Sequence, residues 1–174
     1  MHSKHMRGLT LLEFAVTVLV ISIIGFVALH YYYKLMVDIE RTTMERDLSA
    51  MRSAIGLQIA AHYASGRMAE LEDWTGGNPM ELLVEPPANY IGVIEQVDSE
   101  LKNGSWYFDK SRGVLVYVVR NDLYFESELG IPSRAEFQLE ARFSERQQGA
   151  TAQRNVNGLE LKTLHPFRWV SPWG

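Results

Sequence analysis

The residues that could do acid, base or metal chemistry are dispersed along this chain of 174 residues. It has no cysteine, which excludes a disulfide framework, a thiolate zinc site and a thiol nucleophile. No HExxH, GxSxG or glycine-rich phosphate-binding motif is present. The five histidines form no such motif: they are His2, His5, His30, His62 and His165. We therefore predict that the chain is not an enzyme and uses no cofactor or metal.

Two weaker signals for metal binding have simpler interpretations. The acidic segment Asp98–Asn103 does not place oxygen ligands at every second position, as a calcium loop does, and it contains Lys102. We interpret it as a solvated loop. His62 falls in a predicted helix, where a surface position or a hydrogen-bonded core position is commoner than a metal ligand.

One carboxylate occupies an unusual place. Glu13 is the single charged residue in the 21-residue run Leu9–Leu29, which is long enough to cross a bilayer as a helix. A charged side chain costs about 2.5–3.5 kcal/mol at the centre of a membrane helix and less near the interface, so such a residue usually has a partner. Either Glu13 meets a partner inside the membrane or it lies at headgroup level in a simple anchor.

The flanks of this run predict its orientation. Lys4 and Arg7 precede it without any acid, and basic flanks stay on the cytoplasmic side, so the bulk of the chain is predicted to be exported. A secretory signal would be cleaved after the run at a small-x-small site. The run ends in the sequence Val-Ala-Leu-His-Tyr-Tyr-Tyr, which is a poor site of that kind, and we expect no cleavage there.

The sequence Arg-Gly-Leu-Thr-Leu-Leu-Glu-Phe at residues 7–14 resembles the class III signal of type IV pilins and type II secretion pseudopilins. The resemblance implies that prepilin peptidase cuts between Gly8 and Leu9 and methylates the new N-terminus. Leu9 replaces the commoner phenylalanine, and Glu13 becomes the fifth residue of the mature chain. Residues 1–8 are then the leader, 9–33 a transmembrane and polymerisation helix, and 34–174 a periplasmic globular domain.

The resemblance implies a structural subunit of a type IV pilus or a type II secretion pseudopilus. Its expected partners are prepilin peptidase, other pilin or pseudopilin subunits, the inner-membrane assembly platform and the lipid bilayer. Glu13 could accept hydrogen bonds from the Leu9 amine of a neighbouring subunit and so fix the register between subunits. Many major pilins carry a disulfide loop that a chain without cysteine cannot form, which favours a minor subunit. The alternative is a single-pass, membrane-anchored periplasmic binding or sensory domain that does not polymerise.

A single long helix must position Glu13. No proline interrupts the chain from Leu9 to Gly66, and a helix of roughly 55 residues would be about 80 Å long. Its second half is amphipathic, with an apolar stripe that recurs at spacings of three and four residues: Leu48, Met51, Ile55 and Ile59. The mean hydropathy of −0.12 excludes a polytopic membrane protein, and 47% hydrophobic residues exclude a largely disordered chain.

The remainder predicts a small antiparallel sheet with one face covered by the long helix, an α+β, pilin-like fold. Asn78, Pro79 and Glu81 form a helix-start signal, and the short helix that follows stops at the two prolines 86 and 87. Ser144–Asn157, rich in Gln, Arg and Gly, is predicted to be an exposed loop. The predicted strands are Trp106–Asp109, Val114–Arg120, Leu123–Glu126, Glu136–Phe143 and Leu159–Leu164, with a hairpin turn at Lys110–Gly113.

Charge argues against nucleic acid as a partner. Without Lys4 and Arg7, 15 basic residues remain against 21 acidic ones, a net charge of −6. A local basic patch is the minor alternative, and its members would be Arg134, Arg142, Arg146 and Arg154. The aromatic C-terminal segment Leu164–Gly174 is predicted either to pack over the sheet or to form an exposed partner-binding strip.

Overall fold

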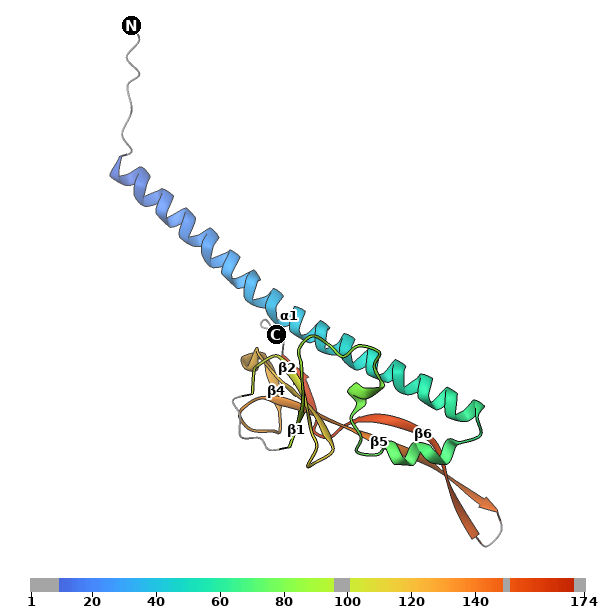
Figure 1. Ribbon diagram of the computed structural model, residues 1–174. Helices are drawn as coiled ribbons and strands as arrows, with labels where there is room; N and C mark the ends of the chain where they lie inside the picture. Colours follow the sequence, from blue (N-terminus) through green and yellow to red (C-terminus); the bar gives the residue numbers. More distant parts are fainter. Residues whose placement is uncertain (1–9, 96–100, 149–150, 171–174) are drawn as a thin grey trace. The chain divides into compact units, whose positions relative to one another are not determined.

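The computed structural model describes residues 10–95, 101–148 and 151–170 (Figure 1). The chain divides into two compact units, Met1–Asp38 and Ile39–Gly174. The leader and cleavage-site residues, Lys4, Arg7, Gly8 and Leu9, lie outside the described residues, as does the first half of the acidic segment Asp98–Asn103.

One helix, α1, runs from Leu11 to Ala64 and confirms the predicted single long helix. It ends just before Gly66, whose φ of 69° is open to glycine but strained for other residues. Within its first half the Thr17 and Ser22 hydroxyl groups are satisfied by the helix itself, because Thr17 donates to the Glu13 carbonyl and Ser22 to the Val18 carbonyl. This helix is long and apolar enough, by length and composition, to cross a membrane.

The second unit contains a mixed five-stranded sheet of order β1-β2-β3-β5-β6. Its strands are β1 (Tyr90–Ile94), β2 (Ser105–Asp109), β3 (Val114–Val118), β5 (Arg134–Gln148) and β6 (Thr151–Thr163). The prediction of a purely antiparallel sheet is wrong, because β1 pairs with β2 in the parallel sense while the other pairs are antiparallel. Turn signals identify hairpin neighbours only, and a parallel neighbour leaves no such signal in the sequence.

The β2–β3 hairpin is as predicted, with Gly113 at a φ of 62° in its turn. The next predicted strand, Leu123–Glu126, begins instead with a 3-10 turn, η3 (Asp122–Tyr124), and continues as β4 (Phe125–Ser127). β4 leaves the main sheet and pairs with β7 (Phe167–Trp169), a strand that the sequence did not predict.

The predicted loop Ser144–Asn157 is wrong over most of its length. β5 and β6 remain paired out to Gln148 opposite Thr151, and the two strands continue together beyond the rest of the sheet (Figure 1). The polar composition favoured a loop, but backbone groups pair across a ribbon whatever the polarity of their side chains. A register shift between Arg142 and Phe143 marks where the ribbon departs from the regular sheet.

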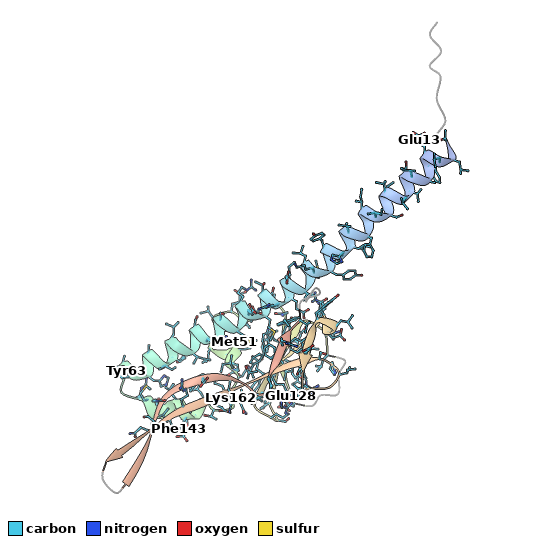
Figure 2. The ribbon with its side chains drawn as sticks, turned by 180° about the vertical axis from the view of Figure 1, so that it is seen from behind. Glu13, Met51, Tyr63, Glu128, Phe143 and Lys162 are labelled. Atoms are coloured by element: carbon cyan, nitrogen blue, oxygen red, sulfur yellow. The ribbon has the colours of Figure 1, made fainter. Side chains whose placement is uncertain are left out.

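The apolar stripe of α1 covers one face of this sheet. Met51 is fully buried on the side of the helix that faces the sheet (Figure 2), and it shares a core with Trp106, Leu115 and Phe137. Two 3-10 helices, η1 (Met68–Trp74) and η2 (Pro79–Leu82), contribute Leu71 and Met80 to the same core. The start signal at residue 78 is confirmed, since the Asn78 side chain accepts a hydrogen bond from the Met80 N–H at 3.1 Å. The element that follows is shorter than predicted, because it is a 3-10 helix that ends at Leu82 rather than a helix that reaches the two prolines.

The expectation that only one face of the sheet is covered is wrong at its centre. β2 and β3 are buried at every position. Their second face forms a separate apolar cluster of Tyr107, Val114, Val116 and Val118, with Ile94, Leu101 and Leu164 packed against it. The end of β1 and two residues outside the strands, Leu101 and Leu164, therefore shield the face that α1 leaves open.

Candidate functional site

Glu13 lies in the first turn of α1 (Figure 2). Its backbone N–H donates to Thr10 Oγ1 at 3.3 Å, which is the first half of a capping box. An acid in the first turn also interacts favourably with the helix dipole. Among the described residues no group donates a hydrogen bond to the carboxylate or pairs with it, so both carboxylate oxygens remain open to a partner.

The surface around Glu13 is apolar and uncovered. No residue in the most hydrophobic stretch of the helix is buried within the chain. Exposed fractions are 87% for Leu11, 61% for Phe14 and 62% for Ile24. Burying such side chains is worth roughly 1.5–3 kcal/mol each, so this surface favours apolar surroundings over water.

Four carboxylates that the sequence analysis did not single out are buried in the second unit: Glu40, Asp47, Asp109 and Glu136. Glu40, on α1, accepts hydrogen bonds from the Tyr117 hydroxyl at 3.1 Å and from the Arg120 and Asn121 backbone N–H groups at 2.6 and 2.9 Å. The Asn121 side chain donates a fourth bond. Burial and the neighbouring Glu40 carboxylate raise the pKa of Tyr117, so its hydroxyl stays protonated and donates.

Asp47 lies two turns further along the same face of α1. Its Oδ2 accepts a hydrogen bond from the Trp106 indole N–H at 3.0 Å, in the middle of the core. Arg46 lies 3.4 Å from Oδ1. The pair joins the helix to β2 through one charge-assisted bond, which is stronger than a bond between neutral groups.

Glu136, on β5, is held by two arginines. Arg134 Nε and Arg112 Nη1 both donate to its Oε1 at 3.0 Å, and Arg112 Nη2 donates to Oε2. His165 Nε2 lies 3.8 Å from Oε2. Burial by itself would raise the pKa of Glu136, but the hydrogen bonds from Arg112 and Arg134 outweigh it and hold the pKa below its usual value.

Hydrogen-bond donors already occupy the buried carboxylates of the second unit. The carboxylates of Glu40 and Glu136 are saturated by donors, and no described histidine is placed to exchange a proton with Glu40 or Asp47. His62 Nδ1 lies 2.8 Å from the Gln58 carbonyl on its own helix, which fits a satisfied helix residue. Within residues 10–95, 101–148 and 151–170, no three histidine or acidic side chains gather as a metal site would require.

Two members of the predicted basic patch have carboxylate partners in the described part of the chain. Arg134 is committed to Glu136, and Arg142 Nε lies 3.5 Å from Glu160 Oε2. The side chains of Arg146 and Arg154 lie outside the described residues.

The described part of the C-terminal segment is anchored. Phe167 and Trp169 are half-buried and pack against the main core, with Phe125 stacked on Phe167 at 5.3 Å between ring centroids. This agrees with packing over the fold up to Val170, whereas Trp173 lies outside the described residues.

Sequence reasoning missed Glu40, Asp47 and Glu136 because charged residues on an amphipathic helix or an alternating strand are normally assigned to solvent. For the two acids on α1, the sequence did contain one signal of burial, which is their spacing along the helix. Glu40, Asp47 and Met51 continue the spacing of three, four or seven residues of the apolar stripe, which places both acids on the buried face. No protein family, curated protein or solved structure matches the chain, and its functional assignment depends on its own residues.

Proposed function

We propose that the chain is a structural subunit, a minor pilin or pseudopilin, of a type IV pilus or a type II secretion pseudopilus. The observation that carries the proposal is Glu13, whose carboxylate has no partner among the described residues while the apolar surface around it is uncovered. A second subunit can provide both an apolar helix surface and a hydrogen-bond donor. The motif at residues 7–14 supplies that donor as the new amine of Leu9.

In this proposal the apolar half of α1 has two environments. Before assembly it lies in the inner membrane with the N-terminus in the cytoplasm and the second unit in the periplasm. During assembly it exchanges lipid for the helices of neighbouring subunits, an exchange between two apolar surroundings with little net transfer energy. Glu13 then fixes the register between neighbouring subunits, because a buried carboxylate is stable only where the Leu9 amine of the neighbour reaches it.

The second candidate is an anchored periplasmic binding or sensory domain that does not polymerise. It is favoured by the position of Glu13 in the first turn of α1, where a carboxylate interacts favourably with the helix dipole without any second chain. In that case Glu13 lies at headgroup level and needs no second chain.

Two measurements test the fibre proposal in the full chain. Co-expression with prepilin peptidase should remove residues 1–8, as read from the N-terminal mass. Glu13→Ala should insert into the membrane as the parent does, because it removes a charge from the apolar run, yet it should fail to enter fibres.

Glu45→Ala is the matched control, since Glu45 is an exposed acid on the same helix that pairs only with Arg41 four residues earlier among the described residues. It should be processed and assembled normally. An intact leader in the presence of the peptidase, or normal fibre entry by Glu13→Ala, would contradict the proposal and favour the simple anchor.

A further inference from the structure

A groove runs between α1 and the edge strand β6 in the second unit. Its volume is about 430 Å³, and its apolar floor consists of Ile55, Ile59, Leu159 and Leu161. β6 is the last strand of the sheet, and its described backbone groups hydrogen-bond to no strand other than β5. The groove is therefore bounded by a helix on one side and by an open sheet edge on the other.

Gly56 opens the helix wall of this groove. A Cβ atom added at this position would meet no atom within 4 Å apart from the helix's own backbone and neighbouring residues, so the space next to Gly56 is open. Glycine in a helix interior is less stable than alanine by roughly 0.5–1 kcal/mol. The sequence thus keeps a locally weaker helix at the point where a larger residue would fill the groove.

The rim of the groove is basic. Its charged lining residues are Arg52, Arg142, Glu160 and Lys162, a net charge of +2 in a chain of net charge −4. Arg142 pairs with Glu160, and Lys162 with Glu140. Arg52 is exposed and has no hydrogen bond or ion pair with any described residue, so one rim charge is open to a carboxylate from outside.

The complementary surface lies on the same chain in the connection between β4 and β5. Residues 121–133 contain three acids and no basic residue. Glu126 pairs with Arg168, but Glu128 (Figure 2) is exposed and has no partner among the described residues. Three residues later Ile131 projects with 96% of its surface exposed, an apolar side chain that nothing in the described chain covers. We call Glu128–Ile131 the acidic knob.

We propose that the acidic knob of one copy of this chain docks into the α1–β6 groove of a second copy. Ile131 enters the apolar floor and Glu128 meets Arg52 at the rim. Knob and groove are different surfaces, so the contact is heterologous and each copy keeps one free knob and one free groove. Such a contact adds copies in an open series. It rests on the proposed fibre function and names the surfaces through which the second units meet.

Disulfide cross-linking of the full chain in detergent tests the contact directly, because the chain has no cysteine of its own. Thr163→Cys lies on the groove rim and Gly130→Cys beside Ile131, where an added Cβ atom meets nothing within 4 Å outside its chain neighbours. The double variant should give a ladder of covalent multimers on oxidation, whereas either single variant should give none. Absence of a ladder from the double variant, or dimers alone, would overturn the proposal.

Filling the groove separates docking from folding. In the double-cysteine chain, Gly56→Leu should lower the cross-linked fraction about tenfold while leaving the helix at least as stable. Ala60→Leu, one turn further along α1 and outside the groove, is the matched control and should leave the ladder unchanged. A ladder that survives Gly56→Leu would overturn the proposal.

Exchanging the charges of Arg52 and Glu128 provides a second control. Arg52→Glu and Glu128→Arg should each weaken the ladder, and the two together should restore it, because the pair is then reversed between copies. Glu85→Arg, next to the exposed Val84 on another loop, should have no effect. Purified chain in detergent needs neither peptidase nor assembly platform, so a missing ladder with normal Glu13-dependent fibre entry would reject only this contact.

Discussion

At the scale of single residues, Trp106 and Trp169 both have a buried indole nitrogen, but the two differ in hydrogen bonding. The Trp106 N–H donates to the buried Asp47 carboxylate at 3.0 Å. The Trp169 indole nitrogen is also buried, but no described group accepts a hydrogen bond from it. Substitution to phenylalanine removes the same N–H from both sites, and only at residue 106 does it leave a buried charge without its donor.

We expect Trp106→Phe to lower the free energy of unfolding by about 2–3 kcal/mol, since a hydrogen bond to a charged group is lost and Asp47 remains buried. Trp169→Phe should lower it by about 1 kcal/mol or less, because removing an unsatisfied donor offsets part of the lost packing. Urea unfolding of the full chain in detergent, followed by circular dichroism, compares the two. Equal losses would show that the Asp47 bond contributes nothing beyond packing.

Glu136 predicts an acid-dependent loss of stability. Its pKa in the folded chain lies below the usual 4.5 because Arg112 and Arg134 outweigh its burial. A depressed pKa means that its stabilising effect is complete above the unfolded pKa and is lost as pH falls through the folded pKa. The difference in urea midpoint between the parent and Glu136→Gln should therefore be constant near neutrality and shrink below about pH 4.5. A difference that persists unchanged to pH 3 would contradict this assignment.

The residues found only in the structure share one property. Glu40, Asp47 and Glu136 are charged, and burial of a charge depends on donors that come from distant parts of the chain. No local sequence pattern predicts that Asn121 will lie beside Glu40, because the two residues are 81 positions apart in the chain. Glu13 was accessible to sequence reasoning for the opposite reason, since its apolar surroundings are its own neighbours in the chain.

At the scale of elements, Glu40 attaches α1 to the turn that follows β3. Glu40→Ala should lower the free energy of unfolding by about 2–4 kcal/mol, because the Arg120 and Asn121 N–H groups lose a buried acceptor. Hydrogen exchange of the α1 amides after Ile39 should rise in the same variant. The exposed Glu45→Ala should change stability by about 0.5 kcal/mol or less. Equal exchange in the two variants would contradict the anchoring role.

The elements themselves were predictable where one local pattern dominated. α1 follows from its apolar run and its stripe, and the β2–β3 hairpin from alternation around Gly113. The distal part of the β5–β6 ribbon could not be predicted, because its sequence lacks hydrophobic alternation, while the pairing of its strands is made by backbone groups that every residue carries. β1 was missed since it is short and interrupted by Gly92 at a φ of 107°.

At the scale of the whole molecule, the first unit should associate with membranes independently of the charges in the second. Replacing Leu19 and Ile23 by lysine places two charges near the middle of the apolar run, each costing about 2.5–3.5 kcal/mol. We expect this double variant to be released by alkaline carbonate extraction, whereas the parent and Glu13→Ala stay with the membrane. Retention of the double lysine variant would contradict a bilayer-spanning first half of α1.

The positions of the tryptophans determine which part of the chain fluoresces in such experiments. All four tryptophans, at positions 74, 106, 169 and 173, follow the end of α1 at Ala64. The aromatic residues before that point are phenylalanine and tyrosine. Light absorbed selectively by indole therefore excites only the chain after Ala64. Its emission can follow the folding of the globular unit in intact chains embedded in lipid, with no fluorophore attached and no contribution from the apolar helix.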